Sequence, residues 1–316
     1  MFKAEIQAFD NSRKVVLSHS SGLKAEILAD YGAALNAFFI PTRNQTYLNI
    51  IDGYNSANEP NESGAHYKGV FLFPFPNRLK NGEWMHEGKK LQFPINEGAR
   101  NNALHGNLFN CSFEIVETSE SVEMASVLLS YKPKTIPDYY PFDFQIDIEY
   151  ILTESEGLTV KTTVHNLADK NLPFGLGWHP YFKTGSLIND LVFLLKDVKA
   201  IDVDSQMIPT GSTFDFRIFD NPQTIGEVSL DTGFELQTKE IYKVQILDPE
   251  KKLKFTVWQE AGEDGYQYIQ IYTPPHRQSI AIEPMSARAN ALQDNSGGLQ
   301  SLAPGNSLTF FWGIGL

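Results

Sequence analysis

The sequence predicts an all-β fold, a large and mainly antiparallel β-sandwich with few short helices. Three observations support this prediction. Apolar and polar residues alternate with a period of two along several segments, which is the pattern of a strand with one buried face. Turn-forming residues separate these segments. Long amphipathic helical patterns are absent, so a sandwich or barrel is favoured over alternating β-α units.

The alternation is clearest in residues 144–152 (FQIDIEYIL), 158–166 (LTVKTTVHN) and 253–259 (LKFTVWQ). Turn signals between strand-like runs predict hairpins, and they lie at Glu87-Gly88, Glu154–Gly157 and Asp248–Glu250. The best helical candidate is short, at Ala287–Asp294. No repeat, linker or charge block divides the chain, so we expect one domain over residues 1–316.

Composition excludes several classes of protein. Of 316 residues, 12% are aromatic and only 20% are charged, which is enough apolar material for a large core. The formal net charge of −12 disfavours nucleic acid as a partner, because such a field repels phosphate backbones. No segment has the length and apolarity of a signal peptide or a membrane span, so no membrane partner and a cytoplasmic location are expected.

The motifs of the common cofactor and metal sites are missing. The single cysteine, Cys111, allows neither an internal disulfide nor a thiolate metal cage. Gly175-Leu-Gly177 starts like a dinucleotide fingerprint, but a proline follows at position 180 and no crossover helix is indicated. The histidines are not spaced as an obvious metal pair. We therefore expect no metal and no cofactor.

Three segments place a titratable side chain at a turn or at the end of an apolar strand. The first is residues 101–107 (NNALHGN), in which His105 precedes Gly106. This order predicts a sharp backbone turn beside the imidazole. The alternative is a histidine that only fixes the turn by hydrogen bonds.

The second segment is residues 174–182 (FGLGWHPYF), where alternation puts Gly177 and His179 on one face. Glycine on a strand clears space for a close approach. Pro180 is expected to end the ladder and leave His179 at a rim, with Tyr181 two positions on. The alternative is a core or rim histidine whose hydrogen bonds are satisfied.

The third segment is residues 279–286 (SIAIEPMS). Ile280 and Ile282 are expected to face the core, so Glu283 faces the opposite side. A carboxylate at the end of an apolar strand costs desolvation unless it has a partner. The alternative is a solvated glutamate at a sheet edge. Arg78, after the aromatic run FLFPFPN, can either clamp hydroxyl groups or cap a strand.

Together these segments resemble the aldose 1-epimerase family, also called galactose mutarotases. The resemblance covers nearly the whole chain, and its motifs follow in one order: Asn77-Arg78 with Asn81-Gly82, Leu104–Gly106, His179–Phe182, Ile208–Gly211, Asp215–Arg217, Glu283-Pro284 and Leu302–Gly305. It implies a galactose mutarotase-like supersandwich that binds one sugar on its concave face.

The resemblance also implies roles for individual residues. Glu283 matches the general base and His179 the general acid. The side chains expected to bind the sugar are Arg78, His105, Asp231, Asn77 and Tyr181. Aromatic rings that are candidates to stack on the sugar are Phe73, Trp178 and Tyr181.

The expected activity is the interconversion of α and β anomers of a free hexose such as glucose or galactose. A base takes the proton of the C1 hydroxyl and an acid protonates the ring oxygen, so the chemistry needs no metal and no cofactor. One alternative is a hexose-6-phosphate epimerase, for which Arg78, Arg100 and Arg288 are the candidate cations. Another is a non-catalytic sugar-binding β-sandwich. A glycosidase is disfavoured because only one strong carboxylate candidate is present. The oligomeric state is left open.

Overall fold

The computed structural model describes residues 1–42, 46–61 and 67–316, and these residues form antiparallel sheets with very little helix. The all-β prediction is confirmed. In the described part of the chain, helix is limited to α1 (Ala291–Asp294) and two single 3-10 turns, η1 (Glu59–Asn61) and η2 (Ile188–Asp190). None of these helices is long and apolar enough to cross a membrane.

The helix predicted at Ala287–Asp294 is shorter than expected. The N-cap residue Asn290 has φ 64°, which is a left-handed conformation, so residues before it cannot continue the helix. Only the last four residues of the predicted segment, Ala291–Asp294, are helical.

The largest sheet has nine strands and contains two of the three predicted hairpins. Glu154–Gly157 connects β13 to β14 and Asp248–Glu250 begins the turn from β23 to β24, so both hairpins are confirmed. Glu87-Gly88 connects the separate hairpin β8–β9, which is also confirmed. In sheet order the nine strands are β11 (Glu114–Glu120), β12 (Met124–Tyr131), β13 (Phe144–Thr153), β14 (Gly157–Asn166), β28 (Ser307–Gly315), β24 (Leu253–Glu260), β23 (Ile241–Asp248), β18 (Val192–Leu194) and β21 (Gln223–Thr224).

A second sheet has eight strands and carries the candidate site residues Tyr181, Asp231 and Glu283. Its central strand β26 pairs with β25 on one side and with both β16 and β17 on the other. The sheet contains β20 (Pro209–Asp215), β19 (Val198–Val203), β22 (Asp231–Leu236), β25 (Tyr268–Tyr272), β26 (Ile280–Met285), β16 (Gly177–Trp178), β6 (Phe71–Leu72) and β17 (Tyr181–Phe182).

The N-terminal residues form a third sheet of five strands, β1 (Phe2–Phe9), β2 (Ser12–His19), β3 (Lys24–Leu28), β4 (Ala34–Pro41) and β5 (Tyr47–Asn49). Three two-stranded ribbons complete the fold: β7 (Arg78–Lys80) with β10 (Asn102–Leu104), β8 (Glu83–His86) with β9 (Lys89–Gln92), and β15 (Leu172–Phe174) with β27 (Gln300–Leu302).

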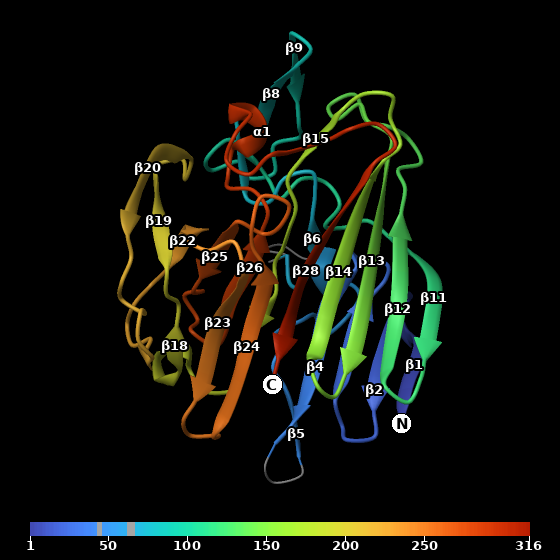
Figure 1. Ribbon diagram of the computed structural model, residues 1–316, viewed down its shortest axis with the longest axis vertical. Coiled ribbons are helices and arrows are strands. Elements are labelled where there is room, and N and C mark those ends of the chain that lie inside the picture. Colours follow the sequence, from blue (N-terminus) through green and yellow to red (C-terminus); the bar gives the residue numbers. More distant parts are fainter. Residues whose placement is uncertain (43–45, 62–66) are drawn as a thin grey trace.

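The core lies between the nine-stranded sheet and the other two. Figure 1 shows β12–β14 in front of the blue N-terminal strands. Trp178 of β16 and Trp312 of β28 are fully buried with ring centroids 5.7 Å apart, which joins the eight-stranded sheet to the nine-stranded one. The hydroxyl of Tyr150 donates to the carbonyl oxygen of Ala33 at 2.7 Å and ties β13 to the loop between β3 and β4. The opposite face of β26 is therefore left for the site.

We expect Tyr150→Phe to lower the free energy of unfolding by about 1–3 kcal/mol, because it leaves the buried carbonyl of Ala33 without a donor. Urea unfolding measures the difference. The matched control is Tyr47→Phe, at a tyrosine that is 56% exposed, and its effect should stay within about 0.5 kcal/mol. Equal effects of the two variants would contradict the assigned importance of the Tyr150 bond.

Candidate active site

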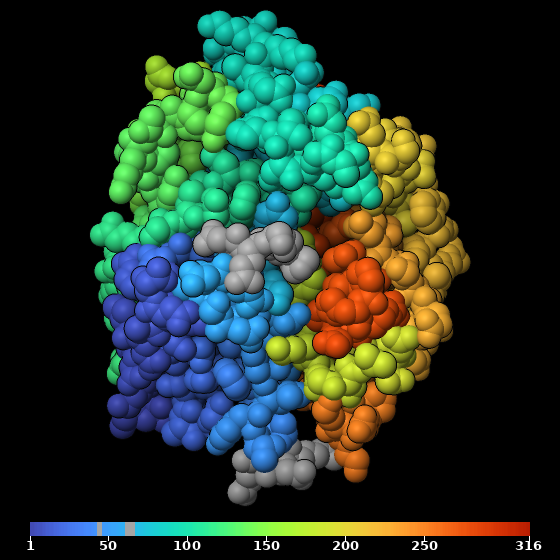
Figure 2. Space-filling model, turned by 180° about the vertical axis from the view of Figure 1, so that it is seen from behind, coloured from blue at the N-terminus to red at the C-terminus, as the bar shows by residue number. Residues whose placement is uncertain are grey.

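The predicted site residues surround one cavity of about 320 Å³. Seen from behind, Figure 2 shows this face of the molecule, where light blue, teal and orange segments that are far apart in the sequence border one another. All seven residues proposed from the sequence line the cavity. The complete lining is Tyr67, Asn77, Arg78, Arg100, Leu104, His105, His179, Tyr181, Asp231, Gln270, Tyr272 and Glu283.

Glu283 lies at the floor of this cavity, on the central strand β26. Its side chain is only 2% exposed, so the alternative of a solvated glutamate at a sheet edge is wrong. Burial, and then the negative charge of Asp231, raise its pKa well above the ordinary 4.5, while the positive charge of Arg78 acts in the other direction. The carboxyl group therefore keeps its proton to a higher pH than an exposed glutamate does.

His179 faces Glu283 directly, with Nε2 3.3 Å from Oε1. Its ring stacks on Tyr181, with centroids 4.9 Å apart and planes at 28°. The imidazole is nearly buried at 7% exposure, which differs from the expected rim position. Pro180 interrupts the ladder without ending it, because Tyr181 of β17 pairs again with Ala281 of β26. The short interruption brings the imidazole of His179 to the carboxyl group.

His105 occupies the sharp turn that the sequence predicted, with φ 64° followed by φ 66° at Gly106. A Cβ atom on Gly106 would lie 2.0 Å from the carbonyl oxygen of Phe73, so only glycine fits there. The backbone N–H of Asn77 donates to Nδ1 of His105 at 3.1 Å. The histidine thus fixes the turn and lines the cavity as well, which joins the two interpretations that the sequence left open.

The protonation of His105 follows from this contact and from its burial. Burial lowers its pKa well below 6.5, and the charges of His179 and Arg78 lower it further, so the ring is neutral. Since a backbone N–H can only donate, Nδ1 must be the acceptor and Nε2 must carry the proton. His105 is therefore a neutral hydrogen-bond donor beside His179, whose ring centroid is 5.1 Å away.

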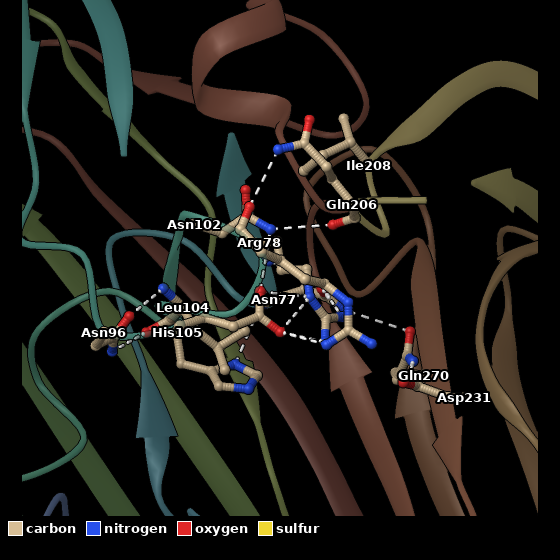
Figure 3. A network of polar contacts seen from close by, with 12 residues as sticks. Asn77, Arg78, Asn96, Asn102, Leu104, His105, Gln206, Ile208, Asp231 and Gln270 are labelled. Atoms are coloured by element: carbon tan, nitrogen blue, oxygen red, sulfur yellow. Dashed lines mark hydrogen bonds and ion pairs between the residues drawn. The ribbon is translucent and has the colours of Figure 1, made fainter. Parts of the chain in front are cut away.

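Arg78 reaches the cavity from the ribbon β7–β10 and is held by a carboxylate. Its Nε lies 3.1 Å and 3.0 Å from the two carboxylate oxygens of Glu97, and Nη2 lies 3.0 Å from Oε1. Nη1 donates to the side-chain oxygen of Asn77 at 3.3 Å. Figure 3 shows the Arg78 guanidinium at the centre of this network, beside Asn77. These contacts hold both the position and the plane of the Arg78 guanidinium group.

Asp231 begins β22 and is linked to the rest of the site by Gln270 of β25. The Gln270 side chain donates to Oδ1 of Asp231 at 2.7 Å and accepts from the amide of Asn77 at 3.2 Å. In the sheet register, Gln270 lies opposite Glu283. Gln270 therefore orients two of the predicted sugar-binding side chains from a position next to the predicted base.

Sequence reasoning missed the cavity roles of Gln270, Tyr67, Leu104 and Tyr272. A signal for two of them was present, because Tyr268, Gln270 and Tyr272 alternate along one strand, and the neighbouring strand carries Glu283. Glu97 lies in a loop that closes on Asn102 by two backbone hydrogen bonds, of 3.1 Å and 3.2 Å, and no periodicity marks it.

Two expectations about this region, on the stacking rings and on Arg288, are wrong. Phe73 and Trp178 are fully buried in the core and cannot stack on a ligand. The close approach expected at Gly177 is present and is made by the protein itself, because an added Cβ would lie 2.9 Å from Cβ of Pro76. Arg288 does not line the cavity; it pairs with Asp294 at 2.9 Å beside a small neighbouring cavity of about 20 Å³.

No metal site is indicated among residues 1–42, 46–61 and 67–316. No group of three or more His, Cys, Asp or Glu side chains in these ranges is placed to hold an ion. What the cavity does contain is a carboxyl group and an imidazole in contact, a neutral imidazole donor, a fixed guanidinium and an acceptor carboxylate. This set can exchange protons with a polyhydroxylated ligand and hold its hydroxyl groups.

Comparisons with known proteins agree with this picture. A family model described as aldose 1-epimerase matches residues 13–314. The chain is 28% identical to the uncharacterized protein YihR of Escherichia coli, over 76% of each chain. It is 24% identical to a maltose epimerase of Levilactobacillus brevis, over 82% of this chain and 76% of that one.

Solved structures share the fold at low identity. A galactose mutarotase-like protein from Clostridium acetobutylicum superimposes with a TM-score of 0.85 at 20% identity, covering 99% of this chain and 97% of that one. Galactose 1-epimerase from Lactobacillus acidophilus gives a TM-score of 0.79 at 18% identity, covering 99% of both chains.

We expect His105 to show the neutral Nε2–H tautomer in ¹⁵N-edited NMR spectra throughout pH 6–8, because burial opposes its charging and Asn77 occupies Nδ1. Titration of its ring with an apparent pKa near 6.5, or an Nδ1–H tautomer, would contradict this assignment.

We expect Glu283→Gln to make the protein more stable than wild type, by a margin that grows with pH. Above the ordinary pKa of 4.5 the unfolded chain releases the Glu283 proton while the folded protein holds it, so wild-type stability falls as pH rises toward the raised pKa. The slope for one group is at most about 1.4 kcal/mol per pH unit.

Urea unfolding at pH 5 to 8 measures this margin. Glu263→Gln is the matched control, because the Glu263 side chain is 83% exposed and its substitution should give no growing margin. A Glu283→Gln margin that does not change with pH would mean that the folded protein does not favour the protonated carboxyl group.

Proposed function

The chain belongs to the aldose 1-epimerase family, and we propose that it interconverts the α and β anomers of a free hexose by opening and closing the sugar ring. One observation carries this proposal. The anomeric hydroxyl and the ring oxygen are bonded to the same carbon, so a base for one and an acid for the other must be close neighbours. Glu283 and His179 are such a pair, in contact at 3.3 Å on the floor of a shared cavity.

In the proposed mechanism, Glu283 takes the proton of the C1 hydroxyl while His179 protonates the ring oxygen. The C1–O bond to the ring oxygen breaks, and the open aldehyde turns about its C1–C2 bond. Closure on the other face reverses both proton transfers. The pair is competent when it carries one proton in total, so the rate should fall at low pH, where both groups are protonated, and at high pH, where neither is.

The remaining residues hold the sugar in this mechanism. His105 donates from Nε2 to a sugar oxygen and stays neutral, so it does not compete as an acid. Arg78 donates to hydroxyl groups and Asp231 accepts from them, with Asn77 beside both. Fixed donors and acceptors of this kind reduce the entropy lost on reaching the transition state. Tyr181 forms a wall of the cavity and sets the plane of the His179 ring.

The size and charge of the cavity favour a free monosaccharide. About 320 Å³ is at the lower end of small-molecule sites, which run from about 300 to 1,000 Å³. The arginines considered for a sugar phosphate all form ion pairs with acidic side chains. Glu97 lies 3.0 Å from Arg78 and 2.9 Å from Arg100, and Asp294 pairs with Arg288. A hexose 6-phosphate is therefore the less favoured substrate.

The alternative of a non-catalytic sugar-binding protein explains less of the site. Burying a carboxyl group beside another negative charge destabilises the folded state. Neutral amides and hydroxyls hold sugar hydroxyls without that cost. A group that titrates at a raised pH is what proton transfer near neutrality requires.

We expect Glu283→Gln and His179→Asn each to lower kcat/KM for anomerisation by about 10²- to 10⁴-fold, because each removes one proton-transfer group. Polarimetry of freshly dissolved α-glucose and α-galactose gives the rates. The controls are the same substitutions at exposed positions, Glu263→Gln and His276→Asn, which should keep the wild-type rate.

Two outcomes would count against the proposal. If both site variants keep the wild-type rate, Glu283 and His179 do not carry out the proton transfers. The wild-type protein could also bind these sugars while free and phosphorylated hexoses equilibrate only at the buffer rate. That result would favour the alternative of a non-catalytic sugar-binding protein.

A further inference from the structure

We propose that Glu97 makes the cavity selective for uncharged sugars, because it neutralises the two arginines that line the cavity. The inference rests on the proposed function and specifies its substrate class. Arg78 and Arg100 are the only lysine or arginine side chains in the described lining of the cavity. A single carboxylate, that of Glu97, engages both, and the sequence motifs do not include it.

The contacts of Glu97 are numerous and close. The carboxylate receives three hydrogen bonds from Arg78, of 3.0 to 3.1 Å, and one of 2.9 Å from Nη1 of Arg100. The side-chain amide of Asn102 donates to Oε2 at 3.0 Å. Only 12% of the Glu97 side chain is exposed, compared with 41% for Arg100. The carboxylate is thus enclosed by donors and does not itself face the ligand.

The backbone prevents Glu97 from turning away. The N–H of Glu97 donates to the carbonyl oxygen of Asn102 at 3.1 Å, and the N–H of Asn102 donates back to Glu97 at 3.2 Å. These bonds close a small loop that carries both the carboxylate and Arg100. The Asn102 amide is also anchored to the carbonyl oxygen of Gln206 at 3.0 Å, as Figure 3 shows. The acid and one of its cations therefore move as one unit.

The protonation state of Glu97 is consistent with this role. Burial alone would raise its pKa, but the hydrogen bonds from Arg78, Asn102 and Arg100 outweigh burial and lower it. Glu97 is therefore ionised at neutral pH. Two arginines and two carboxylates, Glu97 and Asp231, then leave this side of the cavity without excess positive charge. Protons can be exchanged by Glu283 and His179 without a strong field from uncompensated cations.

The consequence for a ligand concerns its charge. An incoming phosphate or carboxylate must compete with Glu97 for the guanidinium groups, and it also meets the negative charge of Asp231. Sugar hydroxyl groups need only the N–H groups of Arg78 that Glu97 does not use. With Gln in place of Glu97, the shape is retained and one negative charge is lost, so the two arginines become available to an anion.

The test compares binding of glucose and glucose 6-phosphate by isothermal titration calorimetry in the wild-type protein and in Glu97→Gln. We expect wild type to bind glucose 6-phosphate more weakly than glucose. Glu97→Gln should bind glucose 6-phosphate about 10- to 100-fold more tightly than wild type does, the gain of one charge-assisted contact. This gain should shrink as salt is raised, since it is electrostatic. A folding defect cannot produce tighter binding.

Three further variants sharpen the result. Glu97→Asp keeps the charge and should not gain affinity for glucose 6-phosphate. Glu263→Gln removes an equal charge far from any contact with the cavity lining and should not gain affinity either. Adding Arg100→Gln to Glu97→Gln should remove part of the gain, because only Arg78 then remains available to the anion.

The outcomes separate this inference from the proposed function. The role of Glu97 is overturned by equal affinity of wild type for the two sugars, by no gain in Glu97→Gln, or by a gain that loss of Arg100 does not reduce at all. If Glu97→Gln does not fold, the wild-type ratio of the two affinities decides. Failure of wild type to accelerate anomerisation of any free hexose overturns the function, whatever the calorimetry shows.

Discussion

The rest of the site depends on the placement of an almost completely buried carboxyl group at the floor of the cavity. Glu283 lies on a central strand, flanked by hydrogen-bonded neighbours on both sides, so its backbone cannot move to expose the side chain. Its environment opposes ionisation, and its nearest titratable partner is an imidazole. The polar groups around the cavity are arranged so that this unfavourably buried carboxyl group can serve as a proton acceptor. The fold accepts a local loss of stability at this position, which is typical of active sites.

Antiparallel pairing supplies the precision that the site requires. Neighbouring strands bring Gln270 opposite Glu283, and β22 brings Asp231 opposite Tyr272, two positions from Gln270 along β25. The histidines come instead from irregular backbone, a left-handed turn at His105 and a break before Pro180 at His179. Regular strands therefore hold the acceptors, while turns that are fixed by neighbouring strands present the imidazoles.

The sequence was sufficient for the fold class and for much of the cavity lining. Strict alternation in residues 144–166 predicted two strands and the hairpin between them, because a strand with one buried face has no other pattern. The turn at His105 was readable from the glycine that follows it. The helix at residues 287–294 was overestimated because propensity does not reveal the left-handed conformation of Asn290.

Other features could not be read from local sequence. Aromatic residues near the site motifs were equally suited to packing and to stacking, and only the folded structure shows that Phe73 and Trp178 lie in the core. Glu97 lies in a loop without periodicity, and its significance comes from two arginines, one of which is 19 positions away. Contacts of this kind depend on how the ribbon β7–β10 folds over the sheet.

The left-handed backbone at His105 affects how substitutions there must be interpreted. Alanine at this position would remove the imidazole, leave the N–H of Asn77 without its acceptor and place a residue that adopts the left-handed conformation less readily than histidine does. Lost turnover in such a variant would mix a chemical defect with a conformational one. Asparagine tolerates this region of φ and ψ better than alanine, so it is the cleaner probe of what the ring itself contributes.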